Sequence, residues 1–119
     1  MSTKHRNELT HVLNQVKNRL LSLQIQLDYV TDHIDLEMDC ASNPYFLITY
    51  RYLNEHLPRL QAKFKGINQG DIGSHDHVVL KALQEQVMTF NEILMFNYTP
   101  RINTLLAAIK KEKQNLILQ

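Results

Sequence analysis

Apolar residues recur along the first forty positions in alternating steps of four and three, which is the spacing of one helix face. These positions are Leu9, Leu13, Val16, Leu20, Leu23, Leu27, Val30 and Ile34. A strand needs steps of two, whereas this spacing forms the seam of an α-helix that packs nearly parallel to another helix. Because neither Gly nor Pro occurs before Pro44, the pattern predicts one unusually long helix over residues 5–40.

A second seam with the same alternation follows Pro44. Its members are Phe46, Tyr50, Leu53, Leu57, Leu60 and Phe64. The run Ser42-Asn43-Pro44 is typical of a helix start, because a capping residue is followed by proline at the first helical position. Gly66 is typical of a helix end. We therefore predict a helix over residues 45–65, with a kink or a restart at Pro58 because proline lacks a backbone donor.

A third seam follows residues 66–74, a stretch that contains all three glycines and predicts a long loop. The members of this seam are Leu80, Leu83, Val87, Phe90 and Leu94. Ser74 has the side chain of a helix cap and precedes the seam directly. The pattern predicts a third helix over residues 75–97.

The remaining apolar positions predict a fourth helix over residues 100–117. They are Ile102, Leu105, Leu106, Ile109 and Leu116. Thr99-Pro100 repeats the combination of a cap and a proline that starts the second helix. Continuing the third seam without interruption would place Asn97 and Arg101 in the core, but the apolar residues lie one position later. This shift favours two separate helices over one long kinked helix.

The four seams predict an all-α protein, an antiparallel four-helix bundle with heptad seams, built as a single domain over residues 1–119. The first helix would be roughly 54 Å long and the fourth roughly 27 Å. Part of the first helix therefore lacks a partner within its own chain. Either the helix breaks between Asp35 and Cys40, or its overhang packs on a second molecule.

Composition narrows the class of protein. The chain has three Gly and three Pro, where average usage would give about 14 in total, which excludes turn-dense β folds and glycine-rich phosphate loops. The net charge of +1 provides no global field for nucleic acid or membranes. Cys40 is the single cysteine, so disulfides within the chain are excluded. With no apolar run of signal-peptide or membrane-span type, we expect a cytoplasmic protein.

The sequence contains no catalytic or nucleotide-binding motif, so we expect a non-enzymatic protein without a cofactor. Glu8 and His11 have the spacing of a di-iron ligand pair, but such bundles need two copies and this chain has one. His75 and His77 flank Asp76 and are weak candidates for metal ligands. A cluster of these histidines with His33 or His56 is a second alternative for function, a metal-binding bundle.

Two sets of residues are candidates for partner binding. One is an acidic stripe with steps of four, three and four, formed by Asp28, Asp32, Asp35 and Asp39. Three interpretations of this stripe are open: a solvated face, which basic residues of the second helix would balance if they lie opposite it, a docking strip for a basic partner, or a divalent-cation site. The other set is Tyr45, Ile48 and Tyr52, which gives the second helix an additional apolar face. Such a helix is either central in its bundle or carries an interface.

Together these patterns predict a small protein-protein interaction module, an adaptor, chaperone-like or assembly subunit that acts through helical faces and oligomerises. The alternative is a nucleic-acid-associated accessory protein, whose contacts would come from two helices rich in Lys and Arg. These basic residues are Arg51, Arg59, Lys63, Lys65, Arg101, Lys110, Lys111 and Lys113. In its helical pattern and basic last helix the chain resembles small helical primosome accessory proteins, a resemblance that implies binding to nucleic acid and carries no specific motif.

Overall fold

The computed structural model describes the backbone of residues 2–36, 38–68 and 76–118, and the side chains of residues 7–36, 38–67 and 76–117. Every regular element in these residues is helical. The elements are α1 (Ser2–Asp35), the short 3₁₀ helix η1 (Asp39–Ser42), α2 (Pro44–Asn68), α3 (His77–Ile93), the π-helical segment η3 (Leu94–Tyr98) and α4 (Thr99–Leu118). The prediction of an all-α protein is confirmed.

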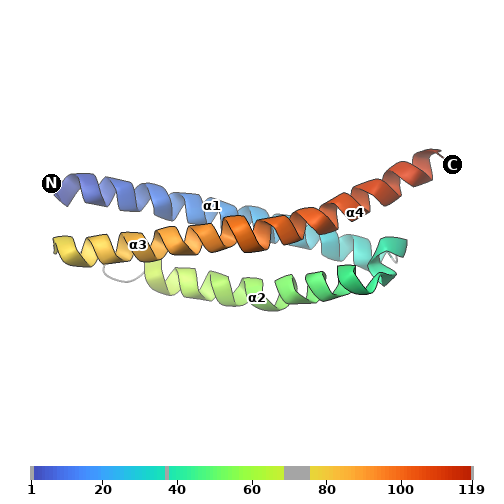
Figure 1. Cartoon of the computed structure of the whole chain (residues 1–119), viewed down its shortest axis with the longest axis horizontal. Helices are drawn as coiled ribbons and strands as arrows, with labels where there is room; N and C mark the ends of the chain where they lie inside the picture. Colours follow the sequence, from blue (N-terminus) through green and yellow to red (C-terminus); the bar gives the residue numbers. More distant parts are fainter. Residues whose placement is uncertain (1, 37, 69–75, 119) are drawn as a thin grey trace.

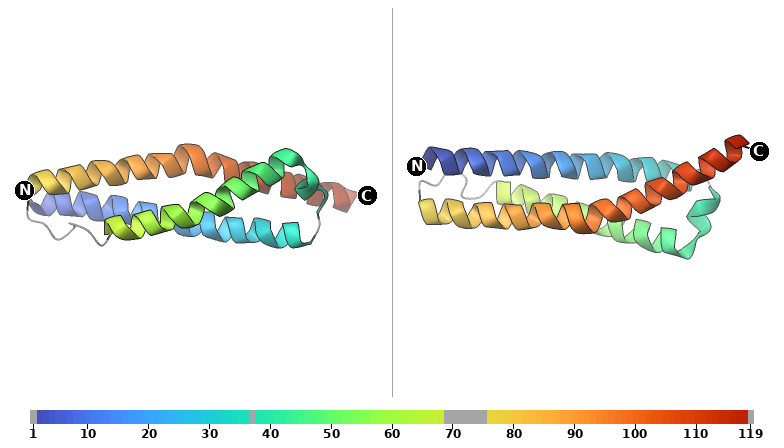
Figure 2. Two further views of the ribbon diagram at one scale, coloured as in Figure 1. Left: turned by 90° about the horizontal axis from the view of Figure 1, so that it is seen from below. Right: turned by 45° about the horizontal axis from the view of Figure 1, so that its top comes forward.

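Three rods form an elongated bundle with dimensions of 62 × 24 × 18 Å. The first rod is α1, the second is α2, and the third is the continuous run of α3, η3 and α4 (Figure 1). The first and third rods run in the same direction, and α2 runs antiparallel to both (Figure 2). The prediction of four antiparallel helices is therefore wrong, because the predicted third and fourth helices lie end to end in one bent rod.

The π-helical segment explains why the register shift at residue 97 does not end the helix. The backbone N–H of Thr99 donates to the carbonyl of Leu94, five residues earlier, and Thr99 Oγ1 donates to the same oxygen at 2.8 Å. A π turn holds one residue more than an α turn. It therefore absorbs the extra residue and returns Tyr98 and Ile102 to the core face, where they are 6% and 1% exposed.

Pro100 also fits this arrangement. A proline inside a regular α-helix clashes with the carbonyl four residues earlier and removes one hydrogen bond. The wider turn of η3 lies directly before Pro100, where it relieves that clash. Thr99 has helical dihedral angles of φ −60° and ψ −47°, so it continues the rod. The predicted helix start at Thr99-Pro100 is wrong.

The first helix is shorter than predicted and is covered by its own chain. It ends at Asp35 rather than at residue 40, which confirms the alternative of a break between Asp35 and Cys40. Its seam from Leu9 to Val30 is buried throughout. The third rod, from His77 to Leu118, is longer than α1 and packs along it. The expectation of an uncovered overhang on α1 is therefore wrong.

Two helix boundaries differ from the sequence expectations, and of the two alternatives at Pro58 the restart is not observed. The helix α2 runs without a restart through Pro58 and bows near the middle of its length (Figure 1). It continues past Gly66 to Asn68, so Gly66 is not its cap. Asp76 caps α3, because its side chain accepts a hydrogen bond of 2.9 Å from the Val78 N–H. Ser74 lies outside the described residues.

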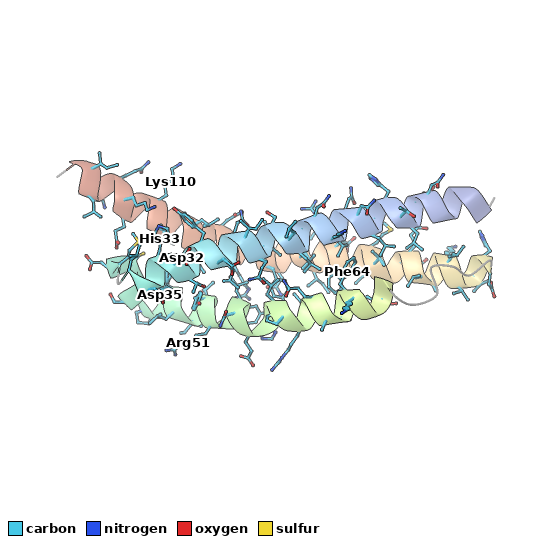
Figure 3. All side chains as sticks on the ribbon, turned by 180° about the vertical axis from the view of Figure 1, so that it is seen from behind. Asp32, His33, Asp35, Arg51, Phe64 and Lys110 are labelled. Atoms are coloured by element: carbon cyan, nitrogen blue, oxygen red, sulfur yellow. The ribbon has the colours of Figure 1, made fainter. Side chains whose placement is uncertain are left out.

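The heptad seams account for most of the core. All seven seam residues from Leu9 to Val30 are buried, as are Phe46, Leu53 and Leu57 of α2. The rings of Phe64 and Phe90 join α2 to α3, with centroids 6.1 Å apart (Figure 3). Leu116 was predicted as core but is 62% exposed. It belongs to the last turns of α4, and that end of the helix extends beyond the bundle (Figure 1).

If η3 holds one extra residue, removing a residue from η3 leaves the seam in phase. The test variant has Phe96 deleted and also carries Pro100→Ala, because a proline would clash in the regular α-helix that the deletion creates. We expect this variant to stay folded, with a loss of less than about 2 kcal/mol in the free energy of unfolding. Deleting the exposed residue Glu85 instead rotates one part of α3 by about 100° relative to the other. Several core side chains would then leave their sites, at about 2–5 kcal/mol each.

Chemical denaturation followed by circular dichroism measures both variants. The interpretation is wrong if the two deletions destabilise the chain equally.

Candidate protein-interaction surface

The outer side of α1 carries exposed apolar residues that the sequence interpretation missed. Leu21, Ile25 and Tyr29 are 59%, 61% and 42% exposed, and Leu36 is 72% exposed. Their spacing of four, four and seven places them on one side of the helix, opposite the buried seam. The Leu36 N–H donates to the Asp32 carbonyl at 3.2 Å, so this helical path extends one residue past α1. We call these four residues the outer stripe.

Acidic residues of the predicted stripe lie beside the outer stripe. Asp28, Asp32 and Asp35 are exposed on α1, and Asp39 is exposed in η1. Asp28 accepts a hydrogen bond of 2.8 Å from Gln24 Nε2. In the described residues no ion pair joins these carboxylates to the basic residues of α2. The outer side of α1 is thus both apolar and negatively charged.

The residues of the second predicted partner face have different surroundings, because two are exposed and one packs against the third rod. Tyr45 and Ile48 are 83% and 64% exposed, in agreement with an accessible surface. Tyr52 instead packs between helices, with its ring centroid 5.8 Å from that of Tyr98 and the Arg101 guanidinium carbon 4.4 Å above it. Tyr52 therefore belongs to the interface between α2 and the third rod rather than to a free face.

A polar and aromatic cluster surrounds Tyr52 at the π-helical segment. Arg101 Nε donates to Asn97 Oδ1 at 2.7 Å, and Asn97 Nδ2 donates to the Tyr52 hydroxyl at 3.5 Å. Burial raises the pKa of Tyr98 to about 12, a hydrogen bond and the charge of Tyr52 act in the same direction, and Arg101 opposes them. Both Tyr98 and Asn97 come from η3. The cluster holds α2 against the bend of the third rod.

A hollow of about 180 Å³ lies between the start of α2 and α4, lined by Cys40, Phe46 and Thr104 among others. The Cys40 N–H donates to Glu112 Oε1 at 2.6 Å. Burial raises the pKa of the Cys40 thiol, and the negative charge of Glu112 raises it further. The thiol is therefore protonated at neutral pH, the form that is a poor nucleophile. This geometry favours a structural link between η1 and α4.

The predicted metal ligands are not brought together in the part of the chain that the structure describes. No three His, Cys, Asp or Glu side chains there lie close enough to hold a metal ion. His33 is buried and its Nδ1 donates to the Tyr29 carbonyl at 2.7 Å, whereas His56 stacks on Tyr52. His77 is the first residue of α3. His75 lies outside the described residues.

The basic residues proposed for nucleic acid face several directions. Arg59 forms an ion pair of 3.1 Å with Glu55 on its own helix. Arg101 lies over Tyr52 of α2, whereas Lys113 lies over Tyr29 of α1, so these two residues of α4 contact different neighbours. Lys63 borders the groove between α2 and α3. The structure therefore does not gather these residues on a single face.

The last turns of α4 are basic and apolar at once. We call residues 110–117 the α4 tail. Lys110, Lys111 and Lys113 are exposed in it, and Leu116 and Ile117 are 62% and 83% exposed. Lys113 Nζ donates to the Tyr29 hydroxyl at 3.0 Å. Beyond this contact the tail extends past the other helices (Figures 1 and 2).

Comparison with known proteins gives no family to which this geometry can be assigned. No protein-family model, no curated protein and no solved structure matches the chain. Among the described residues, no helix is both long enough and apolar enough to cross a membrane. The surfaces of the molecule are therefore interpreted from their own chemistry.

The raised pKa of Tyr98 predicts a specific alkaline instability. In the folded chain Tyr98 keeps its proton to about pH 12, whereas the unfolded chain releases it near the ordinary value of 10.0. The stabilisation is therefore complete below about pH 10 and is lost as the pH rises towards 12. We expect the melting temperature to fall in this range, and to fall less steeply in Tyr98→Phe.

The matched control is Tyr45→Phe, because Tyr45 is exposed. This variant should keep the pH dependence of the unaltered chain in thermal melts monitored by circular dichroism. Equal slopes for all three proteins would show that Tyr98 is not the responsible group.

Proposed function

We propose that this protein is a small non-enzymatic interaction module that binds a helical segment of a partner protein along the outer stripe of α1. The observation that carries this proposal is the row of exposed apolar side chains Leu21, Ile25 and Tyr29 on a helix whose opposite side is already buried. A helix that is apolar on two sides is either central in its fold or carries an interface. Because the outer side of α1 faces solvent, the interface is the favoured interpretation.

The spacing of the outer stripe suits a helical ligand. Side chains at intervals of one turn contact an amphipathic helix through its own positions at i, i+4 and i+7. From Leu21 to Leu36 the stripe covers 16 residues, and its two ends are about 22 Å apart along the helix axis. A partner helix of about four turns covers the whole stripe, and a helix of about two turns covers half of it.

The carboxylates beside the outer stripe select the charge of the partner. Asp28, Asp32 and Asp35 are exposed and lie within two turns of Tyr29. Opposite charges at the rim of an interface speed association and exclude partners of the same charge. We therefore propose that the partner segment is basic as well as amphipathic.

The titratable groups with shifted pKa values favour a binding role over a catalytic one. Tyr98 and Cys40 both have raised pKa values, and burial is the main cause in each case. General bases and nucleophiles need accessible, activated forms near neutral pH. A buried phenol and a protonated thiol supply neither.

Site-specific photo-crosslinking in cells tests the proposed surface. A photoreactive phenylalanine analogue that replaces Ile25 lies within the outer stripe and should therefore crosslink to the bound partner protein. The same analogue in place of Phe96, which is 74% exposed on η3, is the matched control and should crosslink weakly. Crosslinking that is absent at Ile25, or equal at both positions, would contradict the proposal.

Truncating the outer stripe should reduce the crosslinked product without unfolding the chain. We expect Leu21→Ser, added to the Ile25 analogue, to weaken binding by roughly 5-fold to 30-fold, as for a central apolar contact. The free energy of unfolding should change by less than about 0.5 kcal/mol, because Leu21 is exposed. Val78→Ser, at another exposed apolar residue, should leave the crosslink unchanged.

A further inference from the structure

We infer that the helix bound by the outer stripe of α1 is the α4 tail of a second copy of this chain, which makes the protein a reciprocal dimer. This inference rests on the proposed function of the outer stripe and names its partner. Three properties of the described residues carry it: charge, the order of charged and apolar residues, and direction.

The charges of the two surfaces are opposite. The outer side of α1 presents Asp28, Asp32 and Asp35 in steps of four and three. The α4 tail presents Lys110, Lys111 and Lys113. In Figure 3, Asp32 and Asp35 on α1 and Lys110 on α4 are at the same end of the molecule. Two copies joined at this end would therefore bring opposite charges together.

The order of residues along each surface agrees with antiparallel docking. The tail is basic at its start and apolar at its end, at Leu116 and Ile117. The outer side of α1, followed from Asp35 back to Leu21, first carries all three carboxylates with Tyr29 among them, and then only the apolar residues Ile25 and Leu21. Antiparallel docking therefore places lysines beside carboxylates and apolar side chains together. Parallel docking would place the apolar end of the tail among the carboxylates.

A second copy supplies the required direction, whereas the same copy does not. Within one chain α4 runs parallel to α1 (Figure 2), and Lys113 of the tail contacts the outer stripe at Tyr29. A two-fold axis perpendicular to the bundle reverses the partner, so that its α1 runs antiparallel to the tail. The tail extends past the other helices of its own bundle (Figure 1), which is where the partner's α1 would lie. The same contact then forms twice, as a closed two-fold dimer requires.

A charge-swap experiment tests the dimer directly. One variant carries Asp32→Lys and Asp35→Lys, and the other carries Lys110→Glu and Lys111→Glu. Each variant alone has like charges on both surfaces, so we expect its dimer dissociation constant to rise by about tenfold or more. Mixed in equal amounts, the two variants have both contacts complementary again. The mixture should therefore recover the affinity of the unaltered chain to within about threefold.

Sedimentation velocity over a range of protein concentrations measures these affinities. The control variant carries Lys63→Glu and Lys65→Glu, which make the same change in charge in the last turns of α2, away from the α4 tail. This variant should leave dimerisation unchanged. Circular dichroism confirms that each variant is folded. A monomeric unaltered chain at about 100 μM, far above the dissociation constants of most specific complexes, overturns the inference. Charge-swapped variants that stay dimeric, or a mixture that does not associate, overturn it equally.

The apolar end of the tail provides an independent variant. The double variant Leu116→Ser and Ile117→Ser removes two apolar side chains, which are 62% and 83% exposed, and leaves the charge of the tail unchanged. We expect this variant to weaken the dimer by about tenfold or more, because these side chains would be buried against the partner. Unchanged dimerisation would overturn the inference.

The crosslinks from Ile25 separate this inference from the proposed function. A crosslink to a different protein, together with a monomeric chain, overturns the dimer and leaves the proposed interaction surface in place. A crosslink between two copies that maps to residues 110–117 supports both. A dimer without any crosslink from Ile25 overturns both, because association would then use another surface.

Discussion

The arrangement of this molecule depends on one extra residue in a helix. Because the π-helical segment η3 absorbs that residue, α3 and α4 form a single rod. That rod packs along α1 through α3, η3 and α4, and α2 completes a bundle of three rods rather than four. The same continuity carries the end of α4 past the other helices, beyond the contact between Lys113 and Tyr29 (Figure 1). The bend therefore determines both the core and the surface proposed for partner binding.

The sequence was sufficient to predict the buried positions but not the connection between α3 and α4. Alternating steps of four and three depend only on helix geometry, so the burial of residues such as Leu13, Leu53 and Val87 follows from the sequence. A shift of one position has two physical solutions, a break or a π turn. Thr99-Pro100 favours a break locally. Packing along α1 instead stabilises the continuous rod, an interaction that local preferences do not contain.

The candidate surfaces were predictable in part for a related reason. The spacing of Tyr45, Ile48 and Tyr52 places them on one side of α2, but a neighbouring helix covers only part of that side. Tyr52 packs on Tyr98 because the bend of the third rod places η3 beside the part of α2 that contains Tyr52. The outer stripe repeats in steps of four from Leu21, but carboxylates lie between its members. A helix side that is polar on average can therefore carry an apolar stripe of its own, separate from the buried seam.

A three-rod bundle also explains where an interaction surface can lie without weakening the fold. Each rod contacts two neighbours, so each keeps one side towards solvent, and apolar residues on that side contribute little to the core. On α1 the seam residues are buried, and Leu21, Ile25 and Leu36 of the outer stripe remain exposed and able to bind another helix. Nearby carboxylates keep this apolar surface hydrated and repel a second acidic surface. A basic helix meets no such repulsion, and the α4 tail is a basic helix whose apolar residues remain exposed within its own chain.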